Sequence, residues 1–287
     1  HVDWARACGF KVISAGKGTR YHPTYHRSTP DTVWDILDKY LRIDDRKSIN
    51  PKMFNSFIDG TKSGIEMSAV CNATGLVPQT DGLSFPPARR FALADVCKPK
   101  SEGGVLEKAG VTEVVSSVDR EDRDIAYNLA MGTYVVFEGE TDYARRCFRE
   151  YHLMPDKRGR YAALYRPTHM IGLELGISVA SVALRGEPTG PPTGFNADVV
   201  ATAKRALKAG EMLDGEGGVC VWGKQQPADV SRARGYLPLG LAHQVRLKRD
   251  IAEGECLKWS DVEIDEKDLA VTVRREMEAA FGRRNAG

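Results

Sequence analysis

The sequence lacks the features that mark three broad classes of protein. No apolar run approaches the ~18 residues that a membrane-spanning helix requires, so we expect no membrane partner. The 41 basic and 39 acidic residues give a net charge of +2, which provides no electrostatic reason to expect a nucleic-acid partner. Neither a GxGxxG dinucleotide fingerprint nor a Walker phosphate loop occurs. What is present is an ordinary globular composition, 42% hydrophobic and 28% charged, with room for two domains in 287 residues.

The six cysteines are scattered along the chain, and no two of them form a CxxC pair. Closely spaced pairs are typical of zinc sites, and regular cysteine frameworks are typical of secreted domains. We therefore predict free thiols in a reducing compartment, a cytoplasmic location and no metal site. His22 and His26 are four residues apart, but they lie in a predicted loop without a nearby carboxylate pattern.

The N-terminal segment has the pattern of a helix, a buried strand and a turn. Residues 1–9 predict the end of an amphipathic helix that Gly9 stops, and residues 10–15 predict a strand of the buried parallel type. The Gly-Lys-Gly sequence at 16–18 predicts a tight turn. One helix and one strand cannot form a sheet, so either this pair packs on elements outside this sequence or the protein was cut there.

The middle of the chain contains the clearest helix and strand signals. Asparagine followed by proline begins a helix at residue 51, and Gly75 is expected to end it. Helices are predicted over residues 29–41, 51–74 and 171–184, and β-branched content predicts strands over 111–118 and 133–138.

A linker rich in proline and glycine, residues 186–194, precedes the last third of the chain. Beyond it, residues 204–213 and 248–257 share the pattern Lys-Arg-x-(Leu/Ile)-x-x-Gly-Glu-x-Leu. We expect each copy to contain a turn at its glycine, and the two copies to form a small pseudo-symmetric β-module. An amphipathic helix is predicted over residues 268–281.

Lys17 is the first candidate for chemistry. It directly follows a predicted buried strand, at the carboxyl end where open α/β sheets bind ligands. Its ammonium group could contact a cofactor or a polarised carbonyl. The alternative is an exposed lysine in a turn.

Asp59, Lys62 and Glu66 form the second candidate group. Spacings of three and four residues put them on one face of the helix predicted over 51–74. A lysine flanked by two carboxylates can transfer a proton or orient a substrate. The alternative is a solvated ion-pair face.

Arg166 and His169 form the third candidate group. Pro167 restricts Arg166 to an extended conformation, and an arginine binds a carboxylate or phosphate through two parallel hydrogen bonds. His169 lies near the start of the next predicted helix. The alternative is a histidine that caps a buried helix end.

Four stretches of the sequence resemble homoserine-dehydrogenase-like oxidoreductases, some of which are described as deoxyxylulose-phosphate-reductoisomerase-like. The most specific of them contains the pattern DGTKxxxEMxxxxNATG. The stretches are ISAGKG (13–18), FIDGTKSGIEMSAVCNATGLVP (57–78), EGGVLEKAGV (102–111) and LYRPTHMIGLELGISVA (164–180). The doubled KRxLxxGExL units resemble the C-terminal SAF-type β-clip module of that family, so the resemblance covers nearly the whole chain.

The resemblance implies a fold that combines α/β and α+β parts. Residues 1–43 would be the tail of a Rossmann nucleotide-binding domain, and residues 44–190 an α+β domain for substrate binding, catalysis and oligomerisation. Residues 191–287 would be the SAF-like β-clip domain with a C-terminal helix. A complete Rossmann domain needs about 150 residues, so we expect most of it to lie outside this sequence.

The resemblance also implies roles for single residues. The catalytic residues would be Lys17, Lys62 and Glu66; the substrate would be bound by Asp59, Asn72, Arg166 and His169; and the NADP or NAD cofactor would be contacted by Gly16, Lys17 and Gly18. Cys71 stands where the family has alanine. A divalent metal is not predicted. If one were bound, Asp59 and Glu66 are the clustered carboxylates that could hold it.

The leading hypothesis is an NAD(P)-dependent oxidoreductase that acts on a small phosphorylated or carboxylated hydroxy-compound and forms a homo-oligomer. One alternative is a non-catalytic binding or scaffold protein built on the SAF-like module. Another is a lyase or hydratase that uses Lys62 as a base without a nucleotide. Convergence of Lys17, Lys62 and Arg166 on one pocket would favour an enzyme.

Overall fold

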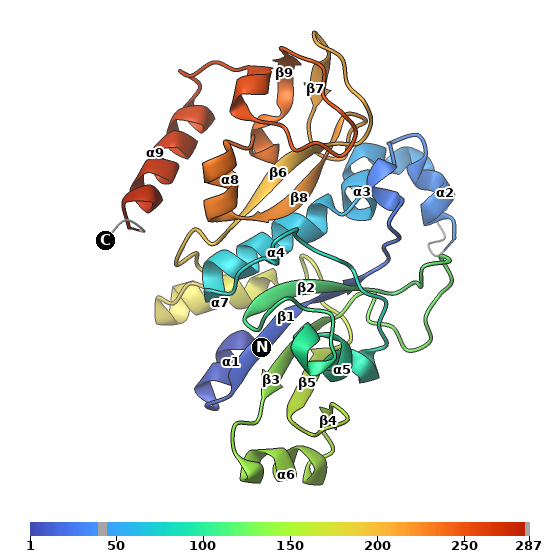
Figure 1. Ribbon diagram of the computed structural model, residues 1–287, viewed down its shortest axis with the longest axis vertical. Coiled ribbons are helices and arrows are strands. Elements are labelled where there is room, and N and C mark those ends of the chain that lie inside the picture. Colours follow the sequence, from blue (N-terminus) through green and yellow to red (C-terminus); the bar gives the residue numbers. More distant parts are fainter. Residues whose placement is uncertain (40–44, 285–287) are drawn as a thin grey trace. The chain divides into compact units, whose positions relative to one another are not determined.

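The structure is a computed structural model that describes residues 1–39 and 45–284 (Figure 1). The chain forms two compact units. The first contains His1–His22 and Ala69–Gly194, and the second contains Pro23–Ser68 and Phe195–Gly287. Each unit therefore consists of two stretches of chain, whereas the resemblance implied three consecutive domains. That functional division stays a prediction.

The first unit is built on a five-stranded mixed sheet. Its strands are β1 (Lys11–Thr19), β2 (Val111–Ser116), β3 (Thr133–Glu138), β4 (Met154–Pro155) and β5 (Tyr161–Arg166), and its helices include α1 (Val2–Ala7), α5 (Leu93–Val96), α6 (Asp142–Glu150) and α7 (Leu175–Arg185). The strand order is β2-β1-β3-β5-β4, and Figure 1 shows β1 between β2 and β3. Strand β1 is parallel to β2 and antiparallel to β3.

Buried β-branched and aromatic residues explain why these segments form strands. All six residues of β2 are buried, and five of the six residues of β3 are. One core cluster joins the sheet to α5, and it includes Ile13, Val115, Tyr134, Val136 and Leu93. The strands predicted near residues 10, 111 and 133 are therefore confirmed. The first of them was expected to be of the parallel type, and it is parallel to β2 but antiparallel to β3.

The turn predicted at residues 16–18 is wrong, because these residues continue β1 to Thr19. The two glycines serve close packing between neighbouring segments. A Cβ atom at Gly16 would lie 1.8 Å from the carbonyl oxygen of Glu113, and one at Gly18 would lie 1.8 Å from that of Leu129. No larger residue fits at either position without displacing a neighbouring backbone.

The second unit contains two small antiparallel sheets, β6-β8 and β10-β9-β7. Its elements are α2 (Val33–Leu37), α3 (Pro51–Ile58), β6 (Ala197–Ala203), β7 (Met212–Asp214), β8 (Val221–Pro227), α8 (Ala228–Arg234), β9 (His243–Leu247), β10 (Val262–Glu263) and α9 (Leu269–Arg284). Helix α4 (Thr61–Thr74) contributes Thr61–Ser68 to this unit and the following residues to the first. The fold as a whole is thus mixed α/β, with small β-rich parts after the linker.

The two near-repeats of the sequence face each other in the second unit. Leu207 and Ile251 each donate a backbone N–H group to the carbonyl oxygen of the other, at 2.9 and 3.0 Å. Gly210 and Gly254 both have positive φ angles, 86° and 77°. The turns expected at these glycines are therefore confirmed, and the two copies are arranged symmetrically about the Leu207–Ile251 pair.

The helix predicted over residues 51–74 is interrupted. Helix α3 ends at Ile58 and α4 begins at Thr61, with Gly60 between them at a φ of 92°. A positive φ cannot be part of a right-handed helix, which explains the break. The start at Asn50 and the end at Gly75 are confirmed, since the Asn50 side chain caps α3 and Gly75 has a φ of 74°.

Other helices differ from the predictions mainly at their ends. Helix α2 covers only Val33–Leu37 of the predicted 29–41, of which residues 40 and 41 lie outside the described residues. Helix α7 begins at Leu175 rather than 171 and ends before Gly186, and α9 confirms the predicted C-terminal helix. Among the described helices, none combines the length and the apolar character needed to cross a bilayer.

Candidate active site

The sheet register brings two of the predicted site residues together. Lys17 of β1 pairs with Thr133 of β3, and Thr133 pairs with Arg166 of β5. Residues directly opposite each other on paired strands project from the same face of a sheet. Lys17 and Arg166 are therefore two strands apart on one face, about 10 Å by the usual strand spacing.

Lys17, Thr133 and Arg166 form a row across β1, β3 and β5, and this row lies where β1 and β5 end. Both strands run in the same direction, because each is antiparallel to β3. Lys17 is 8% exposed, whereas the side chain of Arg166 is 47% exposed. The Oγ1 atom of Thr133, between them, lies 3.1 Å from Nε2 of His1. The buried Lys17, the hydroxyl group of Thr133 and the exposed Arg166 thus lie along one edge of the sheet.

His169 and Glu174 lie next to this row. The Nδ1 atom of His169 is 2.7 Å from the carbonyl oxygen of Met131. A carbonyl oxygen can only accept, so Nδ1 carries the proton and Nε2 of the neutral ring is left as an acceptor. Arg166 pairs with Glu174, whose pKa is lowered by a hydrogen bond from the N–H group of Met170 and by Arg166 itself. His169 is thus held by a backbone carbonyl and stands beside an arginine–carboxylate pair.

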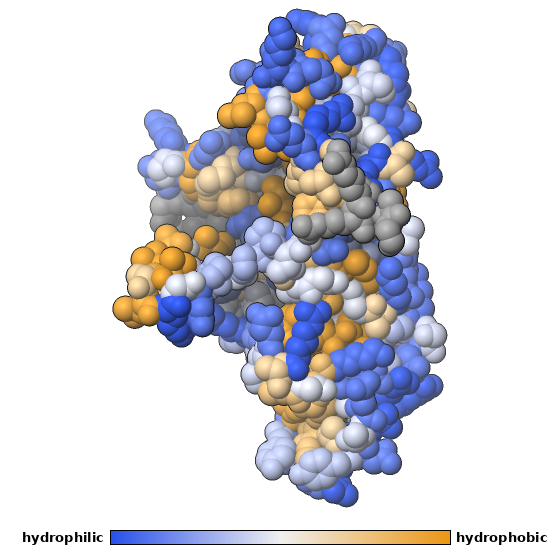
Figure 2. All heavy atoms as spheres, turned by 90° about the vertical axis from the view of Figure 1, so that its left-hand side faces the viewer, coloured by the Kyte–Doolittle hydropathy of each residue, from blue (hydrophilic) through white to orange (hydrophobic). Residues whose placement is uncertain are grey.

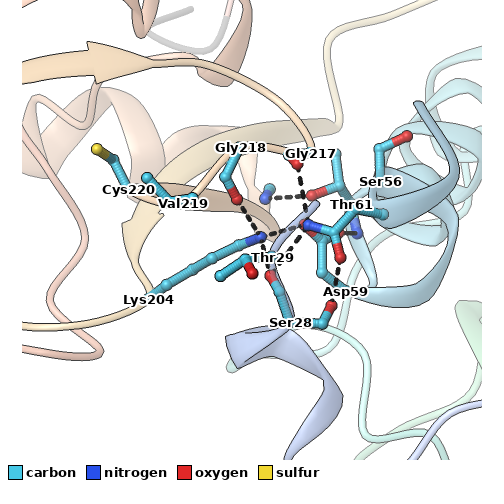
Figure 3. A network of polar contacts seen from close by, with 12 residues as sticks. Ser28, Thr29, Ser56, Asp59, Thr61, Lys204, Gly217, Gly218, Val219 and Cys220 are labelled. Carbon is cyan, nitrogen blue, oxygen red and sulfur yellow. Dashed lines mark hydrogen bonds and ion pairs between the residues drawn. The ribbon is translucent and has the colours of Figure 1, made fainter. Parts of the chain in front are cut away.

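Asp59 does not share a helix face with Lys62, because the chain turns at Gly60. Its carboxylate is fully buried in the second unit, 2.8 Å from the ammonium group of Lys204 (Figure 3). It also accepts a hydrogen bond from the N–H group of Thr61, at 2.9 Å. Burial raises the pKa of Asp59, and Lys204 opposes that shift. These contacts give Asp59 a structural function at the start of α4.

The rest of the DGTKSG segment also packs within the second unit, against β8. The Oγ1 atom of Thr61 accepts a hydrogen bond from the N–H group of Gly223 in β8, at 2.8 Å. A Cβ atom at Gly64 would lie 2.9 Å from the carbonyl oxygen of Gly223. The small residues of this motif therefore allow α4 to approach the β6-β8 sheet closely.

Lys62 and Glu66 keep the helical spacing that the sequence predicted. Their charged atoms are 3.7 Å apart, and their side chains are 25% and 29% exposed. The ammonium group of Lys62 also lies 4.2 Å from the centre of the Phe57 ring. Both residues belong to the second unit, whereas Lys17 and Arg166 belong to the first.

Asn72 lies in the part of α4 that belongs to the first unit. Its carbonyl oxygen accepts hydrogen bonds from the N–H groups of Thr193 and Gly194, at 2.7 and 3.1 Å. The main chain of Asn72 thus holds the end of the linker, and binding of a substrate by its side chain stays a prediction.

The cysteines are free thiols, as predicted from their spacing. Burial raises the pKa of Cys71 and of Cys97 to about 12, which leaves both protonated and unreactive at neutral pH. Within residues 1–39 and 45–284, no group of three or more His, Cys, Asp or Glu residues is arranged to hold a metal ion.

Two important residues were not predicted from the sequence. Thr133 begins a strand, and only the pairing of three strands shows that it separates Lys17 from Arg166. Glu113 is a fully buried carboxylate in β2 that accepts hydrogen bonds from Gln79, Ser84 and the N–H group of Phe85. The sequence did offer a signal for Glu113: a single glutamate in an otherwise uncharged strand. Such a residue requires hydrogen-bond partners when it is buried.

Comparison with protein families identifies the class to which this arrangement belongs. Residues 1–175 match the family model described as the catalytic domain of oxidoreductase DRL. The match covers more than half of the chain and includes every predicted site residue. The chain therefore belongs to this oxidoreductase family. Comparison with curated proteins found no match to the chain.

Proposed function

We propose that the chain forms the substrate-binding part of a nicotinamide-dependent oxidoreductase that acts on a small hydroxy-compound carrying a phosphate or carboxylate. The row of Lys17, Thr133 and Arg166 is the observation that carries this proposal. Two cations about 10 Å apart on one face can hold the two ends of a ligand of a few carbon atoms. The family assignment supports redox chemistry at this site.

The two cations would have different functions. Arg166 is exposed and has the planar guanidinium that binds a phosphate or carboxylate, so it would hold the anionic group in competition with Glu174. Lys17 is almost fully buried, where its charge acts more strongly than in water. Its ammonium group would donate a hydrogen bond to the reacting oxygen and stabilise the negative charge that develops there. His169 would accept the substrate's hydroxyl proton through Nε2.

A nicotinamide cofactor would supply or accept the hydride when bound. The glycines beside Lys17 do not fit the phosphates of such a cofactor, because Glu113 and Leu129 occupy the space that a glycine-rich phosphate loop leaves open. The expected contacts of Gly16 and Gly18 with a nucleotide therefore have no support in the geometry. Whether the cofactor is NADP or NAD stays part of the proposal.

The C-terminal part of the chain would be a SAF-like β-clip module. The symmetrical contacts of Leu207 with Ile251 support this interpretation, since a duplicated unit is what the resemblance implies. A scaffold without activity is less well supported, because residues 1–175 match an oxidoreductase catalytic domain.

We further propose that α7 pairs with a second copy of the chain. Eight large apolar residues of α7 and of the turn before it, within residues 170–184, are 46–84% exposed: Met170, Ile171, Leu173, Leu175, Ile177, Val179, Val182 and Leu184. Figure 2 shows hydrophobic residues gathered on the face of the molecule that carries α7. Residues 175–184 carry no charge, which fits an apolar partner, and the same helix of another copy is one.

The proposed function is tested with the substitutions Lys17→Met and Lys11→Met in the natural polypeptide. Both lysines are in β1, but Lys11 is exposed and lies at the opposite end of the strand. With NADPH and a panel of phosphorylated ketones and 2-oxo acids, we expect Lys17→Met to lower kcat by about 10²–10⁴-fold and Lys11→Met to leave it unchanged. Equal activity of both variants, or no oxidation of NADPH with any compound, would contradict the proposal.

A further inference from the structure

A cavity of about 420 Å³ lies in the second unit, between α3, the loop after β7 and the start of β9. It is lined by Asn50, Lys52, Met53, Ser56, Gly215, Glu216, Leu239, Gly240 and His243. Its volume is in the range of sites that bind small molecules. None of these residues belongs to the row of Lys17, Thr133 and Arg166.

Close contacts and hydrogen bonds hold the loop after β7 that forms one wall of the cavity. Gly215 and Gly217 have φ angles of 72° and 68°, and a Cβ atom at Gly217 would lie 2.0 Å from the carbonyl oxygen of Lys52. Two buried side chains fix the loop: Asn55 donates to the carbonyl oxygen of Gly217 at 2.9 Å, and Lys204 donates to that of Gly218 at 2.8 Å (Figure 3). A loop that is already ordered loses little conformational entropy when a ligand binds to it.

One side of the cavity offers hydrogen-bond donors. The ammonium group of Lys52 donates to the carbonyl oxygen of Asp214, and an ammonium group has three donors. The Oδ1 atom of Asn50 accepts from the N–H groups of Lys52 and Met53, so the amide nitrogen of Asn50 is the atom that can serve a ligand. A cation beside an amide donor fits a carboxylate group.

Another side offers acceptors. Glu216 is exposed and carries a carboxylate. Nδ1 of His243 lies 3.2 Å from the carbonyl oxygen of Asp214, which can only accept, so Nδ1 is protonated and Nε2 of the neutral ring is an acceptor. These groups fit a hydroxyl or amino group. Leu239 and Met53 add apolar surface for the carbon atoms of a ligand.

From this arrangement we propose that the cavity binds a small carboxylate that also carries hydroxyl or amino groups. Lys52 and Asn50 hold the carboxylate, and Glu216 and His243 accept hydrogen bonds from the hydroxyl or amino group. A metal ion is a poor alternative, because the lining contains only one carboxylate and one imidazole. This site is additional to the proposed oxidoreductase function and does not depend on it.

The test is titration calorimetry of the full chain with L-malate, L-serine and L-aspartate as probes. We expect at least one of them to bind with a Kd of about 1 mM or tighter. The substitution Lys52→Met is expected to weaken that binding at least tenfold. The matched control is Lys47→Met, which removes an exposed lysine just before α3 that does not line the cavity.

The substitution Glu216→Gln gives a second, independent readout. Glu216 is an exposed loop residue, so its replacement leaves the fold intact and should weaken binding of the same probe. Glu263→Gln, at an exposed position of β10, is its control. Absence of saturable binding of all three probes up to about 10 mM overturns the proposal. Binding that Lys52→Met and Glu216→Gln leave unchanged also overturns it, because the probe then occupies another place.

Discussion

The carboxylate of Asp59 and the ammonium group of Lys204 form an ion pair of 2.8 Å within the second unit, and both side chains are at most 2% exposed. Lys204 also donates to the carbonyl oxygens of Ser28 and Gly218. Asp59 follows α3 directly, and Lys204 belongs to the first near-repeat. The pair therefore connects two distant stretches of the sequence, and it gives the most specific motif of the chain a structural function.

Replacing Asp59 by asparagine should lower the free energy of unfolding by about 3–5 kcal/mol, because Lys204 would remain charged and buried without its counterion. Urea unfolding of the full chain measures this loss. The double variant Asp59→Leu/Lys204→Met removes both charges and should lose less than Asp59→Asn alone. A change below about 0.5 kcal/mol for Asp59→Asn would contradict the structural function of the pair.

Gly16→Ala should destabilise the first unit by several kcal/mol, since the new methyl group would lie 1.8 Å from a backbone oxygen. Gly176→Ala, in α7, is the matched control, because a Cβ atom there meets no neighbour within 4 Å and alanine favours the helix. Thermal unfolding distinguishes the two variants. Equal midpoints for them would show that the close approach between β1 and β2 is not as described.

Gly16 and Gly18 of β1 show which parts of the fold could be predicted from the sequence and which could not. Local signals were sufficient for the caps at Asn50 and Gly75 and for the strands rich in β-branched residues. The glycines of β1 were interpreted as a turn because their cause is not local: it is the main chain near Glu113 and Leu129. The alignment of Lys17 with Arg166 likewise depends on strand pairing, which spacing along the sequence does not contain.

Glu113 should make the stability of the protein depend on pH. Burial raises its pKa from 4.5 to about 7, so the folded state binds a proton more tightly than the unfolded state does. This contribution is complete below pH 4.5 and is lost as the pH rises through 7, by up to ~3 kcal/mol. The free energy of unfolding, measured at a series of pH values from 4.5 to 8, should therefore decrease as the pH rises.

The substitution Glu113→Gln provides the control for that pH dependence. Glutamine does not titrate, so the variant should lose the component of the slope that Glu113 contributes, whatever its absolute stability. An identical pH dependence of the wild type and Glu113→Gln would show that the carboxylate does not titrate in this range.

The proposed pairing of α7 predicts a change in oligomeric state. Glutamate at Leu173 and Leu184, which are 82% and 84% exposed, would place charges in the apolar interface. Light scattering coupled to gel filtration should report a smaller mass for this double variant than for the wild type. Tyr143→Glu, at an exposed position of α6, should keep the wild-type mass. The same mass for all three proteins would exclude α7 as the interface.

The central claim is that Lys17 and Arg166 act on one ligand, and a double-mutant cycle tests it most directly. It requires kcat/KM of the wild type, Lys17→Met, Arg166→Met and the double variant, measured with NADPH and the best carbonyl substrate. If both cations hold the same molecule, their losses of transition-state stabilisation should couple by at least about 0.5 kcal/mol. Strictly additive losses, or a loss from one substitution alone, would contradict a shared site on the face of this sheet.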